Sequence, residues 1–153
     1  MHKPRLNRLA RIHLKQPLYF ITMCTYNRKT ILAQPTAHEA FIDFCKNGAA
    51  HGAFVGRYVL MPDHLHLFVT FASEGVALSV WAKSLKNNLS KYWRSVRVSS
   101  PHWQKGFFDH VLRSADSCEE KWNYVAANPV RAGLVASPVA WPYQGTIHEL
   151  TFR

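Results

Sequence analysis

The run over residues 58–69 constrains the fold of this chain more than any other segment. Apolar and β-branched residues flank the dipeptide Pro62-Asp63, which is typical of a short turn between two strands. Side chains at i and i+2 of a strand point to the same face, so His64 and His66 lie side by side while Leu65 points to the core. The pattern predicts a β-hairpin that presents two imidazoles on one face, a geometry suited to a metal ion. A chain with nine histidines also produces such pairs by chance, so ordinary surface histidines remain the alternative.

Periodicity along the rest of the chain predicts the order β-α-β-β-α-β, followed by one more helix. Strands are expected at 17–26, 54–61, 64–71 and 103–113, and helices from 35 to 48 or 52, at 76–96 and from 117 to about 128. This order is the split βαβ or ferredoxin-like plan of the α+β class. It predicts an antiparallel sheet with helices on one face and the other face free for a ligand. The turn-rich end of the chain has room for one short edge strand.

Local signals indicate where two of the helices begin and which side of a third is buried. Thr36 and Glu39 form a capping box, and Ser117 is expected to cap the last helix with Glu120 three residues on. The helix at 76–96 carries an apolar stripe and, on another side, a basic stripe. The apolar stripe is Leu78, Trp81, Leu85, Leu89, Tyr92 and Val96, and the basic stripe is Lys83, Lys86, Ser90, Arg94 and Arg97.

The length of 153 residues predicts one domain, residues 17–153, preceded by a basic arm over residues 1–16. No run reaches the roughly 18 apolar residues that a membrane span needs, and no apolar segment follows the basic start as in a secretory signal. The three cysteines are scattered and form no CxxC pair. This argues against a zinc ribbon or disulfide framework and favours the reducing cytoplasm, with no membrane partner.

The charge balance predicts a polyanionic partner. Nineteen Lys and Arg stand against nine Asp and Glu, a formal net charge of +10, and five Trp, six Tyr and nine Phe are available for base stacking. We therefore expect nucleic acid, with a solvated helix face as the alternative explanation for the basic stripe. The candidate DNA-binding residues are Arg5, Arg8, Arg11, Arg28, Lys83, Lys86, Arg94 and Arg131.

A second candidate constellation lies in the last predicted helix. Tyr124 and Asn128 are four residues apart and share a helix face. A tyrosine hydroxyl can attack phosphorus, and an amide oxygen can complete a metal shell. Taken alone, Tyr124 is also compatible with a packing role.

Together these motifs resemble a known family. His64-Leu65-His66 resembles the HUH motif of single-strand transposases, in which U is a bulky apolar residue. The segment 103–113, followed by Tyr124 and the run 128–135, resembles the REP-associated tyrosine transposases, a group within the IS200-like superfamily. The likeness covers roughly residues 17–145 and implies the same ferredoxin-like fold.

The resemblance assigns His64 and His66 as metal ligands and Tyr124 as the nucleophile. Related insertion-sequence transposases carry a Gln one helical turn after the tyrosine as third ligand, where this chain has the shorter Asn128. Two imidazoles suit Mn²⁺ better than Mg²⁺, and cellular abundance favours Mg²⁺, so either ion is expected.

The resemblance also implies the reaction and its setting. Tyr124 would cut single-stranded or hairpin DNA of palindromic repeats, forming a 5′-phosphotyrosine link and freeing a 3′-hydroxyl, and a second end would be joined without a nucleotide cofactor. A monomer associated with the bacterial nucleoid is implied, with a dimer that exchanges the tyrosine helix as the alternative.

Two other functions compete with this interpretation. The first is a DNA-hairpin-binding protein with weak or no chemistry. Intact His64, His66 and Tyr124 argue against it, whereas Asn128 in place of the Gln leaves it open. The second is a zinc hydrolase, which the chain disfavours because Leu67-Phe68 follows the histidines and no HExxH pattern is present.

Overall fold

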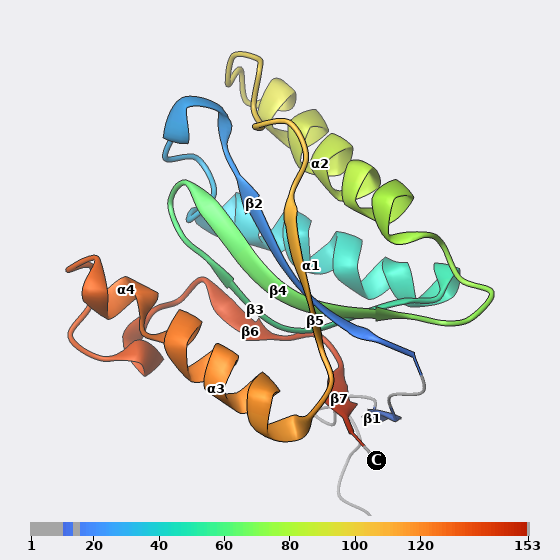
Figure 1. Ribbon diagram of the computed structural model, residues 1–153. Coiled ribbons are helices and arrows are strands. Elements are labelled where there is room, and N and C mark those ends of the chain that lie inside the picture. The colour runs from blue at the N-terminus through green and yellow to red at the C-terminus, as the bar shows by residue number, and fades with distance from the viewer. Residues whose placement is uncertain (1–10, 14–15, 153) are drawn as a thin grey trace, which may run out of the picture.

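A five-stranded antiparallel sheet organises the computed structural model, which describes residues 11–13 and 16–152 (Figure 1). The strands lie in the order β5-β2-β4-β3-β6, and each neighbouring pair is antiparallel. The first four reproduce the predicted ferredoxin-like arrangement, and β6 adds the expected short strand at the β3 edge. Their bounds are β2 Leu18–Cys24, β3 Ala53–Leu60, β4 His64–Phe71, β5 Phe108–Leu112 and β6 Gln144–Thr146.

Helices lie on both sides of the sheet (Figure 1). The long helices α1 (Pro35–Gly48) and α2 (Leu78–Ser95) cover one face, and α3 (Ala115–Ala126) covers the other and leads into the short α4 (Asn128–Arg131). In the described part of the chain, three single 3₁₀ turns connect the elements, at Tyr26–Arg28, Ala49–His51 and Pro138–Ala140.

The main core lies between the sheet and the pair α1 and α2. Leu65 and Leu67 of β4 point into it, as the alternation of the strand predicts. The apolar stripe of α2 is confirmed at its centre and wrong at its end. Trp93 is fully buried and donates its indole N–H to the Ile31 carbonyl at 3.2 Å, whereas Val96 follows the helix end and is 51% exposed.

The second face of the sheet is not free, and the prediction of an open ligand face is wrong. Phe20 and Phe68 make this face apolar, and α3 covers it with Val125 and Trp122 while Trp141 closes one side. Because the strands carry bulky apolar residues on both faces, burial of both faces releases more water than burial of one. A ligand must therefore bind beside α3 rather than on a bare sheet.

Both predicted helix caps are wrong. The helix α1 starts at Pro35, and the Thr36 hydroxyl bonds that of Tyr92 on α2, so it does not cap. The cap of α3 is Ser114, three residues before the predicted Ser117, and its side-chain oxygen accepts the N–H of Ser117 at 3.1 Å. The strand β5 is also shorter than predicted, since residues 103–107 form a loop in which Trp103 makes only an isolated bridge.

Near the chain ends, β1 (Arg11–His13) pairs in parallel with β7 (Glu149–Thr151), a pairing the sequence did not predict. Of the predicted arm, Arg5 and Arg8 lie outside the described residues, and so does the side chain of Arg11. Within the described ranges, no helix is long and apolar enough to cross a membrane.

Candidate active site

The histidine pair lies on β4, the middle strand of the sheet. The His64 and His66 rings are 4.9 Å apart between centroids and meet nearly edge-on. Because Leu65 and Leu67 point to the α1 and α2 side, both imidazoles point to the face that α3 covers. Neighbouring β2 places Thr22 opposite His66 and so supplies the second wall of the site.

His66 is held as a neutral imidazole. Its Nδ1 lies 2.8 Å from the Thr22 hydroxyl, and its ring stacks on Phe20 at 5.3 Å. Burial lowers the pKa of His66 to about 3, aided by the positive charges of His64, Lys121, Arg131 and Arg28. In the tautomer whose Nδ1–H donates to the Thr22 hydroxyl, the neutral ring presents Nε2 as a free electron-pair donor.

His64 is oriented by a carboxylate. Its Nδ1–H donates to Asp63 at 2.7 Å, and the other Asp63 oxygen accepts the Arg28 Nε–H at 2.9 Å. Arg28 reaches this point because Asn27 and Arg28 both have a positive φ, which turns the chain back toward the sheet. Burial opposes ionisation of Asp63, but His64 and Arg28 outweigh it and lower its pKa, so the carboxylate remains an acceptor.

The donor set fits a divalent cation. Both histidines bind protein groups through Nδ1, which leaves both Nε2 atoms for a metal, and hydrogen-bonded ligands of this kind are usual at metal centres. No cluster of three or more His, Cys, Asp or Glu that could hold a metal occurs in the described part of the chain. Further ligands would therefore have to be an amide, water or substrate oxygens.

Tyr124 lies in the last turn of α3 and its side chain is 66% exposed. The guanidinium carbon of Arg131 is 4.1 Å from the centroid of the tyrosine ring, and Arg131 also donates to the Asn128 side-chain oxygen. These three residues, i, i+4 and i+7, therefore form one cluster. The charges of Lys121 and Arg131 contribute to the lowered pKa of His66, so these two cations lie within electrostatic range of the histidine pair.

The predicted DNA-binding residues separate into two groups. Arg28 and Arg131 lie at the site just described. In contrast, Lys83, Lys86 and Arg94 belong to α2, in the layer on the opposite side of the sheet. Lys83 and Arg94 are exposed, whereas the Lys86 ammonium donates to the carbonyls of Gln104 and Gly106 and thereby ties α2 to the loop before β5.

Sequence reasoning missed Thr22, Asp63 and Phe20 as supports of the histidine pair. The sequence could have predicted Asp63, since a carboxylate directly before His64 can reach its imidazole ring. Thr22 and Phe20 carried no signal, because the register of β2 against β4 decides which of its residues meets His66.

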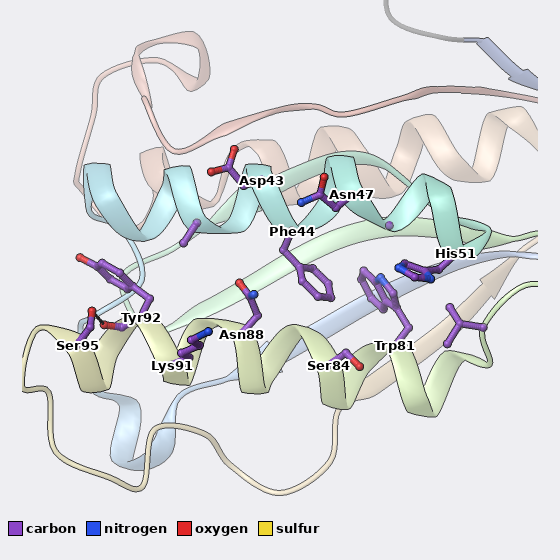
Figure 2. Close-up of a pocket in the computed structure, with 13 residues that line it drawn as sticks. Asp43, Phe44, Asn47, His51, Trp81, Ser84, Asn88, Lys91, Tyr92 and Ser95 are labelled. Carbon is purple, nitrogen blue, oxygen red and sulfur yellow. Dashed lines mark hydrogen bonds between the residues drawn. The ribbon is translucent and has the colours of Figure 1, made fainter.

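A cavity of about 700 Å³ lies away from this site, between α1 and α2 (Figure 2). Phe44 and Trp81 line it together with polar residues such as Asn47, Asn88 and Lys91. None of the predicted metal ligands lines this cavity, nor does the predicted nucleophile, so the cavity is not part of the candidate site.

The buried neutral His66 predicts acid sensitivity. Its pKa rises from about 3 in the folded protein to the ordinary 6.5 on unfolding, so the unfolded chain binds more protons between these values. The stabilising contribution is complete above pH 6.5 and is lost as pH falls toward 3, by about 3 kcal/mol at pH 4. Denaturant titrations with EDTA present should show this slope reduced in His66→Gln, and equal slopes in both proteins would contradict a buried neutral ring.

The sheet order and the paired histidines on its central strand are the arrangement expected of a single-strand transposase of the HUH type. The family model described as Transposase IS200 like matches residues 14–128. The chain belongs to this family.

Two relatives agree with this assignment. The REP-associated tyrosine transposase of Escherichia coli K12 is 23% identical over 151 residues, covering 94% of this chain and 84% of the relative. A putative REP-associated tyrosine transposase of Haemophilus influenzae is 24% identical over 140 residues, covering 84% and 79%. The predicted resemblance to REP-associated tyrosine transposases, and with it the class of enzyme, is confirmed.

Solved structures support the fold. A REP-associated tyrosine transposase bound to a REP hairpin matches with a TM-score of 0.69 at 20% identity, covering 91% of this chain and 82% of that one. A putative transposase of Deinococcus radiodurans matches with a TM-score of 0.54 at 18% identity, covering 82% and 95%. At these identities the matches establish the α+β fold, and the roles of single residues rest on the geometry above.

Proposed function

We propose that this protein is a metal-dependent endonuclease and strand transferase for single-stranded or hairpin DNA, acting through a 5′-phosphotyrosine intermediate. The observation that carries the proposal is the pairing of two oriented imidazoles with an exposed tyrosine held by Arg131. His64 and His66 alone would support only a structural metal site. The exposed Tyr124 phenol, with the Arg131 guanidinium over its ring, supplies a nucleophile.

His64 and His66 would hold Mg²⁺ or Mn²⁺ through Nε2, with the Asn128 amide as a candidate third ligand once Arg131 shares or releases its oxygen. When bound, such an ion supplies positive charge that stabilises the transition state at phosphorus. Asp63 and Thr22 keep both rings in the ligating tautomer, and burial keeps His66 free of a competing proton.

Tyr124 performs the covalent step. Its phenolic oxygen forms a bond to the scissile phosphorus while the bond from phosphorus to the 3′-oxygen breaks, and the electron pair of that bond goes to the 3′-oxygen. The phenolic proton passes to solvent, and the departing oxygen takes a proton from solvent. Arg131, stacked on the ring, stabilises negative charge developing on the phenol. Attack by another 3′-hydroxyl reverses the exchange, so joining needs no ATP.

The substrate assignment rests on charge and on relatives. A chain of net charge +10 fits a polyanion, and one solved relative is bound to a REP hairpin. We assign hairpins of repeated palindromes as substrate, with Arg28 and Arg131 nearest the reacting strand. Lys83 and Arg94, in the opposite layer, are then placed to contact a more distant part of the same DNA. A monomer in the bacterial cytoplasm is the form we propose to act.

The test is a covalent adduct. Purified protein is incubated with Mn²⁺ or Mg²⁺ and a labelled single-stranded oligonucleotide that carries a palindromic repeat from the host genome. We expect a protein–DNA band on a denaturing gel that disappears with EDTA. Retarded DNA on a native gel without any adduct would instead favour the alternative, a hairpin-binding protein that has lost its chemistry.

A further inference from the structure

Lys121 is a cation at the active site that the proposed mechanism does not yet use. Its ammonium lies 5.2 Å from the centroid of the Phe20 ring, and the same ring stacks on His66 at 5.3 Å with an interplanar angle of 17°. Phe20 therefore contacts both the candidate metal ligand His66 and the Lys121 ammonium of α3. Lys121 lies three residues before Tyr124 on the same helix.

The Lys121 ammonium has no anionic or hydrogen-bonding partner within the described residues, although the side chain is half-buried. Other cations near the sheet are engaged: Arg28 pairs with Asp63, and Arg57 pairs with Glu119. A positive charge left beside a cation-binding pair weakens metal binding by Coulomb repulsion. Such an arrangement becomes favourable when an anion enters between them.

The helix position of Lys121 selects the part of the phosphate it can reach. Residues three apart lie on the same side of a helix, so Lys121 and Tyr124 approach the substrate from one side. In an in-line displacement the attacking and leaving oxygens lie on opposite sides of phosphorus. A cation on the nucleophile's helix therefore reaches the non-bridging oxygens and not the departing 3′-oxygen.

We propose that Lys121 is a catalytic residue that contacts a non-bridging oxygen of the scissile phosphate. This inference rests on the proposed function. During attack by Tyr124, negative charge builds on the non-bridging oxygens, and the ammonium stabilises that charge without giving up its proton. The Phe20 ring contacts the ammonium itself through a cation–π interaction, which keeps Lys121 next to the ring that stacks on His66.

The proposal is tested with Lys121→Gln, Lys121→Arg and the control Lys46→Gln, an exposed lysine of α1 in the opposite layer. Single-turnover adduct formation should fall about 100-fold in Lys121→Gln, the size expected for one preorganised contact to transition-state charge. Hairpin affinity should change less than about 3-fold, and Lys121→Arg should recover part of the rate. Electron paramagnetic resonance titrations without DNA should show tighter Mn²⁺ binding in Lys121→Gln, because a repelling charge is gone.

Slower cleavage together with tighter Mn²⁺ binding is a combination that loss of packing does not produce. An unchanged rate in Lys121→Gln would overturn the proposal. So would equal losses of rate and DNA affinity with a smaller salt slope, which would make Lys121 a backbone-gripping residue only. If the wild-type protein forms no adduct, the proposed function itself fails, which separates that outcome from a failure of Lys121 alone.

Discussion

The Tyr124→Phe protein should form no covalent adduct with DNA, while its affinity for a hairpin stays within about 2-fold of wild type. The substitution removes only the phenolic oxygen, the atom that would bond to phosphorus. The ring remains for Arg131 to stack on, and the side chain is 66% exposed, so the fold loses little. Adduct on a denaturing gel and affinity by fluorescence anisotropy measure the two properties separately.

Tyr26 provides the matched control. It is the other exposed tyrosine near the site, 40% exposed in the 3₁₀ turn that carries Arg28. Tyr26→Phe should leave adduct formation unchanged. If the adduct persists in Tyr124→Phe and disappears in Tyr26→Phe, the nucleophile is Tyr26 in the turn after β2, and its assignment to Tyr124 of α3 is refuted.

The β-hairpin that carries the histidines was predictable because neighbouring residues in the sequence determine it. Alternation of leucine and histidine fixes which side chains face the core, and Pro62-Asp63 marks the turn, so β4 begins at His64 and ends at Phe71 as expected. The order of strands followed from the order of elements, since the ferredoxin-like plan allows few arrangements. The resemblance supplied the link between these histidines and Tyr124, which lie 60 positions apart.

The features that sequence reasoning missed depend on partners distant in the chain. Thr36 satisfies the rules for a cap, but a tyrosine of α2 competes for its hydroxyl. Phe20 reads as an ordinary strand residue until α3 is seen to cover that face with Lys121 above the ring. Arg28 reads as a surface cation, and only the left-handed turn at Asn27 brings it to Asp63. Each case requires the packing of two elements that no local pattern specifies.

The second large effect is expected for His66→Gln. An imidazole whose other nitrogen is already held by Thr22 is a preorganised ligand, and the amide that replaces it is a weaker donor on a more flexible stem. Loss of outer groups that orient a ligand costs roughly 10–100-fold in metal affinity, so loss of the ligand itself should exceed about 100-fold. Adduct formation should fall at least as far, because with one imidazole left the protein retains a single strong donor.

His51 provides the matched control for His66. His51 is exposed in the turn after α1, in the layer opposite the pair, so His51→Gln should bind Mn²⁺ and cleave like wild type. Hairpin binding in EDTA should be the same in wild type, His66→Gln and His51→Gln, since DNA affinity comes from cationic side chains and not from the imidazole. If His66→Gln keeps both Mn²⁺ affinity and metal-dependent cleavage, the ion is not held by the β4 pair. The oriented imidazoles would then be structural, and the metal would have to be sought among the oxygens of the DNA.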